Sequence, residues 1–393
     1  MSNRSSTAIK KCCLILSYLL ILVPGCPRDT DEEIEIVNIS NTLGRSYNPA
    51  IAADSWGTFY VVWEDWLPIP ESLFILMTSR PPSGEWSEPE RVLEMNCGQF
   101  PDIEIDKHNT IHLIWRNTDQ ELWGEVLYTK KPLGGTWTEP ETLSIYGMSC
   151  CPDMVVDDNS IVHLVWQEAL ASWPIFYSQK AANGYWSWPV KISRGSTKSR
   201  DDPQIDVGPK GDAHVVWINC YEYGAGSVYK SAPVYATNAV GDTWSYPEKL
   251  YIDQFLETHS PSIVVDNAEV IHVVWASHGD IFYTHKSPGS EWETPARVCS
   301  TNTISGSPDL IGDIDDMLHL VWREGGNNLC YTSKSAGDDW GDIHTYMLNQ
   351  LAFPVPQVAI SESNIGIVYS DALEFDPQGQ DNYEIFFVEI PLN

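Results

Sequence analysis

The sequence predicts an all-β protein, a seven-bladed β-propeller of four-stranded antiparallel blades that is closed by its N-terminal strand. Three markers recur along the 393 residues at one common period, which is the signature of a repeat fold. A proline opens each unit, at Pro49, Pro101, Pro152, Pro203, Pro261, Pro308 and Pro356. A first tryptophan follows at Trp63, Trp115, Trp166, Trp217, Trp275 and Trp322, with Tyr369 in the seventh unit. A second lies at Trp86, Trp137, Trp186, Trp244, Trp292 and Trp340.

Each unit contains four short strand patterns, as the second unit illustrates. Pro101–Asp106 alternates apolar and polar residues, which indicates a half-buried strand. Ile111–Trp115 is apolar at nearly every position, which indicates a strand buried on both faces. Glu125–Lys130 and Trp137–Leu143 supply the third and fourth strands. Four antiparallel strands per repeat are typical of a propeller blade.

The two ends of the chain predict how the ring closes. The last unit supplies strands at 357–360, 365–369 and 383–390 but no fourth strand led by a tryptophan. Ile34–Ile39 has the missing strand pattern and precedes the first unit. We expect it to pair with the seventh blade, because that pairing removes open sheet edges.

The first 25 residues have the layout of an export signal. Arg4, Lys10 and Lys11 precede an apolar run, residues 12–23, that is too short to span a bilayer. Val23–Cys26 then resembles the lipobox of bacterial lipoproteins, which implies a lipidated Cys26. We therefore expect a lipoprotein-type signal peptide (1–25), a short tether (26–33) and a propeller (34–393) in the cell envelope. Ordinary signal-peptidase cleavage nearby is the alternative.

Charge narrows the range of partners. The chain carries 54 acidic and 23 basic residues, a formal net charge of −31. Such a surface repels phosphate backbones, so we expect no nucleic-acid partner. We expect a monomer that touches the membrane only through its lipid anchor.

The turn between third and fourth strands carries a family resemblance. It resembles the Asp-box (BNR-type) repeat of sialidases at Lys130–Trp137, His285–Trp292 and Ser333–Trp340. The glycine and tryptophan are in place, whereas Pro132, Ser287 and Ser335 occupy the aspartate position. The resemblance covers residues 34–390 and implies the fold. It does not carry over the catalytic arginines, because Arg45–Pro49 only approximates the family's Arg-Ile-Pro motif.

Aromatic and acidic residues outside the repeat mark a candidate site. Trp66, Trp123 and Trp173 fall between the second and third strands of blades one to three. We expect these loops on the upper face, where propellers usually bind ligands. Neighbouring positions are Tyr146, Tyr221, Tyr223, Glu64, Asp65, Glu168 and Glu222. Aromatic rings beside carboxylates suit sugar stacking or a protein interface. The alternative is that the loops bury their own aromatics.

Further recurring residues have structural or weaker functional interpretations. Asp102, Asp153 and Asp309 follow the opening prolines and could coordinate Ca²⁺ at the channel mouth, or be solvated. We expect no other cofactor. Five histidines before the first tryptophans are predicted to pack blades, and aspartates at the ends of first strands to cap turns. Six cysteines beyond residue 26 permit a disulfide from Cys97 to Cys150 or Cys151.

The favoured function is that of a membrane-tethered, non-catalytic propeller that binds a glycan or a protein through the upper face. A sialidase-like glycoside hydrolase or lyase is the first alternative, with paired acids drawn from Glu64, Asp65, Glu168, Asp102 and Asp153. A structural platform of an envelope complex is the second.

Overall fold

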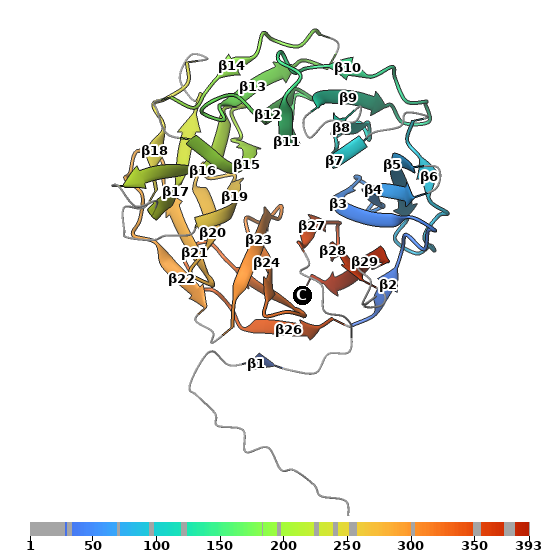
Figure 1. Ribbon diagram of the computed structural model, residues 1–393. Coiled ribbons are helices and arrows are strands. Elements are labelled where there is room, and N and C mark those ends of the chain that lie inside the picture. Colours follow the sequence, from blue (N-terminus) through green and yellow to red (C-terminus); the bar gives the residue numbers. More distant parts are fainter. Residues whose placement is uncertain are drawn as a thin grey trace, which may run out of the picture.

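Seven antiparallel sheets surround a central axis in the computed structural model, which confirms the predicted seven-bladed propeller (Figure 1). The structure describes residues 28–29, 34–68, 71–93, 98–118, 124–182, 184–194, 198–223, 228–238, 243–250, 258–299, 303–348, 355–372 and 382–392. All regular elements in these ranges are strands. None of the described residues belongs to a helix that is long and apolar enough to cross a membrane.

The strands follow the chain outward from the axis in blades one to six. Blades one and two contain β3 (Arg45–Ala53), β4 (Phe59–Pro68), β5 (Glu71–Arg80), β6 (Glu90–Arg91), β7 (Gly98–Ile105), β8 (Ile111–Asn117), β9 (Glu125–Lys131) and β10 (Glu141–Thr142). Blades three and four contain β11 (Ser149–Val156), β12 (Val162–Glu168), β13 (Ile175–Lys180), β14 (Val190–Lys191), β15 (Lys198–Val207), β16 (Ala213–Tyr223), β17 (Val228–Thr237) and β18 (Glu248–Lys249). Blades five and six contain β19 (Thr258–Val265), β20 (Ile271–Ser277), β21 (Asp280–Lys286), β22 (Ala296–Cys299), β23 (Ser305–Gly312), β24 (Leu318–Glu324), β25 (Asn328–Lys334) and β26 (Ile343–Met347).

Blade seven joins the two ends of the chain, as predicted. It contains β27 (Gln357–Ile360), β28 (Asn364–Ala372), β29 (Tyr383–Pro391) and, outermost, β2 (Ile36–Asn38). β2 pairs antiparallel with β29, and the Ile39 amide donates to the Ile385 carbonyl at 2.9 Å. A shorter strand, β1 (Arg28–Asp29), pairs parallel with β26 and adds a fifth strand to blade six. Part of the expected tether is therefore attached to the ring.

The upper face carries the connections between blades and between second and third strands; the lower face carries the other turns. On the lower side, the second tryptophans pack edge-on against a tyrosine of the preceding blade. Trp186 meets Tyr128 at 5.1 Å between ring centroids, and Trp244 meets Tyr177 at 4.8 Å. The second tryptophans precede the fourth strands instead of beginning them, and β6, β10, β14 and β18 have two residues each.

The recurring histidines and aspartates have structural roles. His112 Nδ1 lies 2.8 Å from the Tyr128 hydroxyl, and its Nε2 lies 3.6 Å from the Asp106 carboxylate. The same arrangement recurs around His163, His214, His272 and His319. Asp106 also accepts the amides of His108 (2.9 Å) and Thr110 (2.8 Å), which caps the turn as expected. The Nδ1 partner of each histidine is a tyrosine hydroxyl of the same blade.

Candidate functional site

In five of the seven blades, the innermost strand bends just before its proline. This bend lies at the upper mouth of the channel. The residues there have left-handed φ angles between 48° and 52°: Asn48, Phe100, Cys151, Ser260 and Ser307. The pairing register shifts at the same points, as between Tyr47 and Ala50 in β3. A bulge of this kind re-aims side chains and is common beside binding sites. The mouth is therefore built from non-glycine residues in a strained conformation.

Glu64 is the acidic group at the junction of blades one and two. It is 7% exposed, and its two oxygens accept the Phe100 amide at 3.2 Å and the Asn48 side-chain amide at 2.9 Å. Desolvation raises the pKa of Glu64 to about 7, although these hydrogen bonds and the charge of Arg116 act to lower it. The carboxyl group therefore changes charge near neutral pH.

Tyr47 lies directly opposite Glu64 in the β3–β4 pair. Paired residues of neighbouring strands lie side by side, and the charge of Glu64 acts on the Tyr47 hydroxyl. The Tyr47 ring also lies 4.9 Å from the Tyr383 ring of blade seven. Burial raises the pKa of Tyr47, against the lowering effect of Arg45, and the hydroxyl is therefore protonated at neutral pH.

Arg116 supplies a positive charge close to Glu64. Its guanidinium lies 4.7 Å from the Phe100 ring centroid and donates to the Gln99 side-chain carbonyl. The residue is 9% exposed, and its Nε has no hydrogen-bond partner among the described residues. Gln167, at the equivalent region of blade three, is 2% exposed with a similarly unpaired Nε2. Buried donors of this kind favour a ligand oxygen, because leaving them unpaired costs about 1–3 kcal/mol each.

The predicted aromatic residues lie on several blades. Trp66 is half-buried at the end of β4, 5.0 Å below the Arg45 guanidinium, on the same strand face as Glu64. Tyr146 is 53% exposed at the start of blade three, and Trp173 is half-buried with a φ of 50°. Tyr221, in β16, is covered by the Lys249 ammonium at 3.5 Å. Trp66 is thus the predicted tryptophan that shares a strand face with Glu64.

Three predicted site residues have side chains outside the described parts of the structure. Trp123 lies outside the described residues, and the side chains of Glu222 and Tyr223 are likewise not described.

Two predicted acids are buried inside the blades. Asp65 is 3% exposed and accepts the hydroxyls of Thr42 (2.7 Å) and Ser46 (2.9 Å). Glu168 is fully buried and accepts the Ser149 hydroxyl and the Trp166 indole N–H, both at 2.9 Å. The printed contacts of both acids are with groups of the blades, and Glu168 Oε2 is buried without a hydrogen-bond partner among the described residues.

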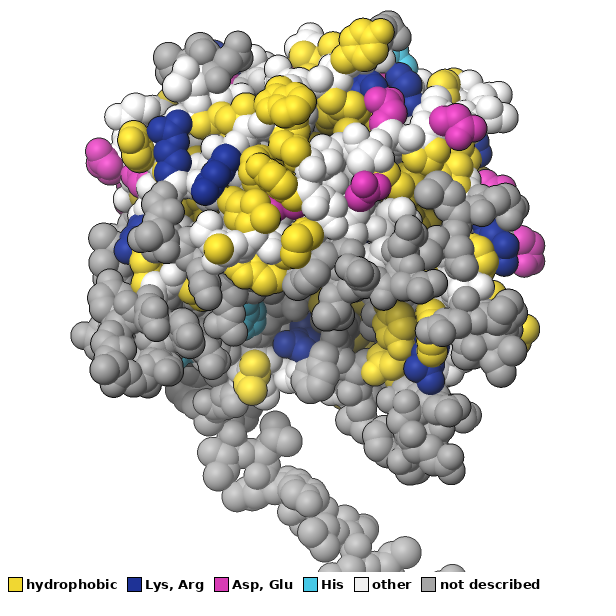
Figure 2. Space-filling model, turned by 45° about the horizontal axis from the view of Figure 1, so that its top comes forward, with side chains coloured by type: hydrophobic (Ala, Val, Ile, Leu, Met, Phe, Trp, Pro, Cys, Tyr) yellow, Lys and Arg dark blue, Asp and Glu magenta, His cyan; other side chains and the backbone are white. Residues whose placement is uncertain are grey.

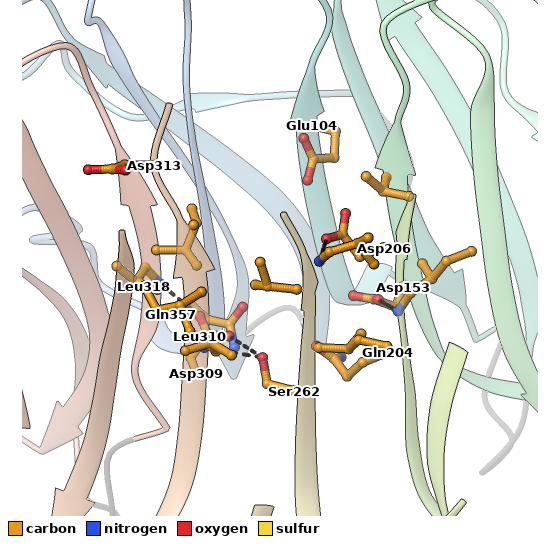
Figure 3. Close-up of a pocket in the computed structure, with 18 of the residues that line it drawn as sticks. Glu104, Asp153, Gln204, Asp206, Ser262, Asp309, Leu310, Asp313, Leu318 and Gln357 are labelled. Carbon is orange, nitrogen blue, oxygen red and sulfur yellow. Dashed lines mark hydrogen bonds between the residues drawn. The ribbon is translucent and has the colours of Figure 1, made fainter. Parts of the chain in front are cut away.

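The three aspartates considered as calcium ligands or as solvated carboxylates lie in the axial channel and link neighbouring blades. The channel cavity has a volume of about 490 Å³ and is drawn in Figure 3. Asp102 accepts the Met154 amide at 2.9 Å, Asp153 the Ile205 amide at 2.7 Å, and Asp309 the Val358 amide at 2.9 Å. Each bond crosses from one innermost strand to the next.

Glu104 and Asp206 also line this cavity and were not predicted from the sequence (Figure 3). They lie three residues after their prolines, whereas the predicted aspartates lie one residue after theirs. Side chains two residues apart in a strand point to the same side, so this pattern predicts that Glu104 and Asp206 also face the channel. Desolvation raises the pKa of Asp102 and Asp206 to about 6 and that of Asp309 to about 7. No group of three or more His, Cys, Asp or Glu side chains in the described ranges is placed to hold a metal ion.

The predicted disulfide is tested only in part. The Cys150 thiol donates to the Gln167 side-chain carbonyl at 3.5 Å and is not in a disulfide. Cys97 lies outside the described residues, so its pairing with Cys151 stays a prediction.

Comparisons with known proteins show the fold. No family model and no curated protein sequence matches the chain. A solved structure of the BP39L lectin from Burkholderia pseudomallei aligns with a TM-score of 0.67 and 10% identity, over 89% of this chain and 100% of that one. A PL25 ulvan lyase with bound -[GlcA(1-4)Rha3S]- aligns at 0.60 and 14%, over 89% and 95%. An α-L-arabinanase of Penicillium chrysogenum, complexed with arabinobiose, aligns at 0.55 and 14%, over 80% and 98%. At these identities the likeness establishes a shared fold.

Proposed function

We propose that this propeller binds a glycan at the upper junction of blades one and two. The observation that carries the proposal is the cluster of half-buried rings, Tyr47, Trp66 and Phe100, around the buried Glu64 and Arg116. Ring faces stack on the apolar faces of sugars, and a carboxylate and a guanidinium pair with hydroxyl and carboxylate oxygens.

The similar structures support the glycan class. One is named as a lectin, one as a polysaccharide lyase bound to a glucuronic-acid-containing saccharide, and one as an arabinanase complexed with arabinobiose.

A glycan array probed with the full chain and with two tryptophan variants tests the proposal. Trp66→Ala is expected to reduce binding at least tenfold, because it removes a stacking surface. Trp188→Ala is the matched control, because Trp188 is 79% exposed on blade three and outside the cluster. Equal loss in both variants, or binding that Trp66→Ala leaves intact, would contradict the assigned site.

A negative array would favour the interpretation as a structural platform. Figure 2 shows hydrophobic side chains gathered on the surface that faces the reader. Tyr185 and Trp188 are 97% and 79% exposed at the outer part of blade three and would suit a protein partner.

A glycan-cleaving enzyme is the second candidate, and the pKa of Glu64 favours it. A carboxyl group with a pKa of about 7 exchanges a proton readily at neutral pH, and Tyr47 lies across the same strand pair. The interior positions of Asp65 and Glu168 remove two expected partners for paired-acid hydrolysis. We therefore favour a lyase over a sialidase-like hydrolase within this candidate.

Incubation with uronate-containing and neutral polysaccharides separates binding from cleavage. A lyase generates unsaturated ends that absorb ultraviolet light, a hydrolase generates reducing ends without that absorbance, and a lectin generates neither. Glu64→Gln is expected to lower any lyase rate at least a hundredfold. An unchanged rate would exclude Glu64 as the acid or base.

We also propose that the chain is exported and anchored through Cys26. β1 begins two residues beyond this cysteine and pairs with β26, so the anchor would leave the ring beside blade six. Membrane fractionation and metabolic labelling with a fatty acid test this proposal. Cys26→Ser is expected to lose the label and move to the soluble fraction, and a labelled variant would contradict it.

A further inference from the structure

The junction of blades six and seven lacks a side chain that fills the other described junctions. Trp186, Trp244, Trp292 and Trp340 each cover a tyrosine of the preceding blade at 4.8–5.3 Å. Blade seven takes its outer strand from the N-terminal segment 34–39, which contains no tryptophan. The corresponding tyrosine of blade six, Tyr331, is therefore left without an indole over it.

A cavity of about 840 Å³ opens at this position on the lower side of the ring. Tyr331 lines it together with His344, whose ring lies 6.1 Å away, and Tyr346. Ile360 and Leu392 of blade seven add apolar walls. The volume falls within the usual range for small-molecule pockets.

The charged groups of this cavity are all acidic. Its lining includes Asp313, Asp315 and Glu362 but no lysine or arginine among the described residues. Asp313 is engaged by His319 at 3.3 Å and by the amides of its own turn. Asp315 and Glu362 are exposed at the rim, where their charge is available to a ligand.

We propose that this junction cavity binds a small organic cation, an ammonium group carried on an apolar body. Carboxylates at the rim attract the positive charge, and the Tyr331 ring, which has no described indole over it, accepts both the cation and its apolar substituents. A bare metal ion would gain nothing from these rings, and the described residues contain no metal-binding group of three ligands. The site is independent of the glycan-binding proposal, because it lies on the opposite face.

Choline and 3,3-dimethylbutan-1-ol, its uncharged isostere, are the probes for a titration of the full chain followed by ligand-detected NMR. Choline is expected to bind at least tenfold more tightly than the isostere. Equal affinity for both probes, or no choline binding, would overturn the proposal.

Two double variants test whether the rim carboxylates Asp315 and Glu362 supply the charge that binds choline. The double variant Asp315→Asn/Glu362→Gln is expected to weaken choline binding at least tenfold. Asp338→Asn/Asp339→Asn removes the same charge from exposed residues of the neighbouring junction and is expected to leave the affinity unchanged. An equal loss in both double variants would show that only the overall charge matters and would overturn the proposed site.

A third variant tests whether choline binds in the cavity beside Tyr331. His344→Trp supplies an indole beside Tyr331 and is expected to abolish choline binding without lowering the thermal midpoint, because His344 is only partly buried. Choline binding that survives this substitution would place the ligand elsewhere. Glycan binding at the upper face is measured on the same variants and is expected to be unaffected, so the two proposals fail separately.

Discussion

Burial and nearby donors act on Glu64 in opposite directions, and burial has the larger effect. The carboxyl group loses water at the junction of blades one and two, which raises its pKa to about 7 despite bonds from Phe100 and Asn48. Arg116 offsets part of that shift. A single side chain thus gains a protonation change near neutral pH from its position in the ring.

Glu64→Gln is predicted to remove a pH dependence from ligand binding. In the native protein, affinity measured by calorimetry between about pH 5 and about pH 9 should change with an inflection near 7, where Glu64 ionises. The variant should show a flat profile in that range. Glu88→Gln, at an exposed position, is the control. An inflection that persists in Glu64→Gln would assign the titration to another group.

Links between blades set the stability at the scale of elements. Near the axis, aspartates bond to the amides of the next innermost strand, as Asp309 does to Val358 at 2.9 Å. Farther out, a tryptophan covers the tyrosine of the preceding blade, as Trp244 does with Tyr177. The junctions of blades two and three, three and four, and four and five carry both kinds of link.

Asp309→Asn is predicted to be more stable than the native protein by an amount that increases as pH rises. The folded pKa of Asp309 is about 7, above its ordinary value of 3.8, so the folded state holds a proton that the unfolded chain has already released. Its contribution to stability therefore falls between these pH values. At about 1.4 kcal/mol per pKa unit, the variant should gain about 2–4 kcal/mol relative to the native protein between about pH 4 and pH 8.

Buried histidines change the stability with pH in the opposite direction to Asp309. The quantity to measure is therefore the difference in unfolding free energy between Asp309→Asn and the native protein at each pH. Burial lowers the pKa of His112 to about 4, so its contribution to stability is lost as pH falls from about 6.5 towards 4. Urea unfolding at several pH values cancels this common effect between native protein and variant. A difference that is independent of pH, or one equally present in the exposed control Asp338→Asn, would contradict the assignment.

Trp244→Ala is predicted to lower the free energy of unfolding by about 3–5 kcal/mol, because it leaves a cavity beside Tyr177. Trp244 is only 5% exposed. Trp188→Ala, at a residue 79% exposed, should change stability by about 0.5 kcal/mol or less. Chemical denaturation of both variants measures the contrast, and similar losses would show that the indole does not link blades three and four.

Ring closure through β2 acts on the whole molecule. The strand contributes only Ile36–Asn38 and the adjoining Ile39, yet it covers the edge of β29 in the last blade. An uncovered edge offers unpaired backbone groups to other chains. The N-terminal segment therefore affects both stability and association.

Ile39→Pro is predicted to destabilise the ring by about 2–4 kcal/mol and to promote aggregation. It removes the amide that donates to Ile385 at 2.9 Å and most of a side chain that is 5% exposed. Ile39→Val keeps the bond and should cost about 0.5–1.5 kcal/mol. Unfolding midpoints and light scattering test the pair, and identical behaviour of the two variants would show that closure does not depend on this bond.

Sequence repetition determined the architecture because every marker has a local cause. The first tryptophans, such as Trp63, are fully buried, and the prolines follow bulges that repeat from blade to blade. The incomplete last unit and the strand pattern at 34–39 likewise required only that sheet edges be paired. Seven blades and their closure could therefore be predicted without knowing any contact.

The tertiary structure decided which side chains form the site. Glu64 and Asp65 are adjacent and were both predicted as site residues, but successive residues of a strand point to opposite faces. Glu64 meets Phe100 of blade two, whereas Asp65 bonds to Thr42 and Ser46. Only ring closure determines which face of a strand contacts which neighbouring blade. Ring closure therefore also determines the burial that shifts the pKa of Glu64 and the cavity beside Tyr331.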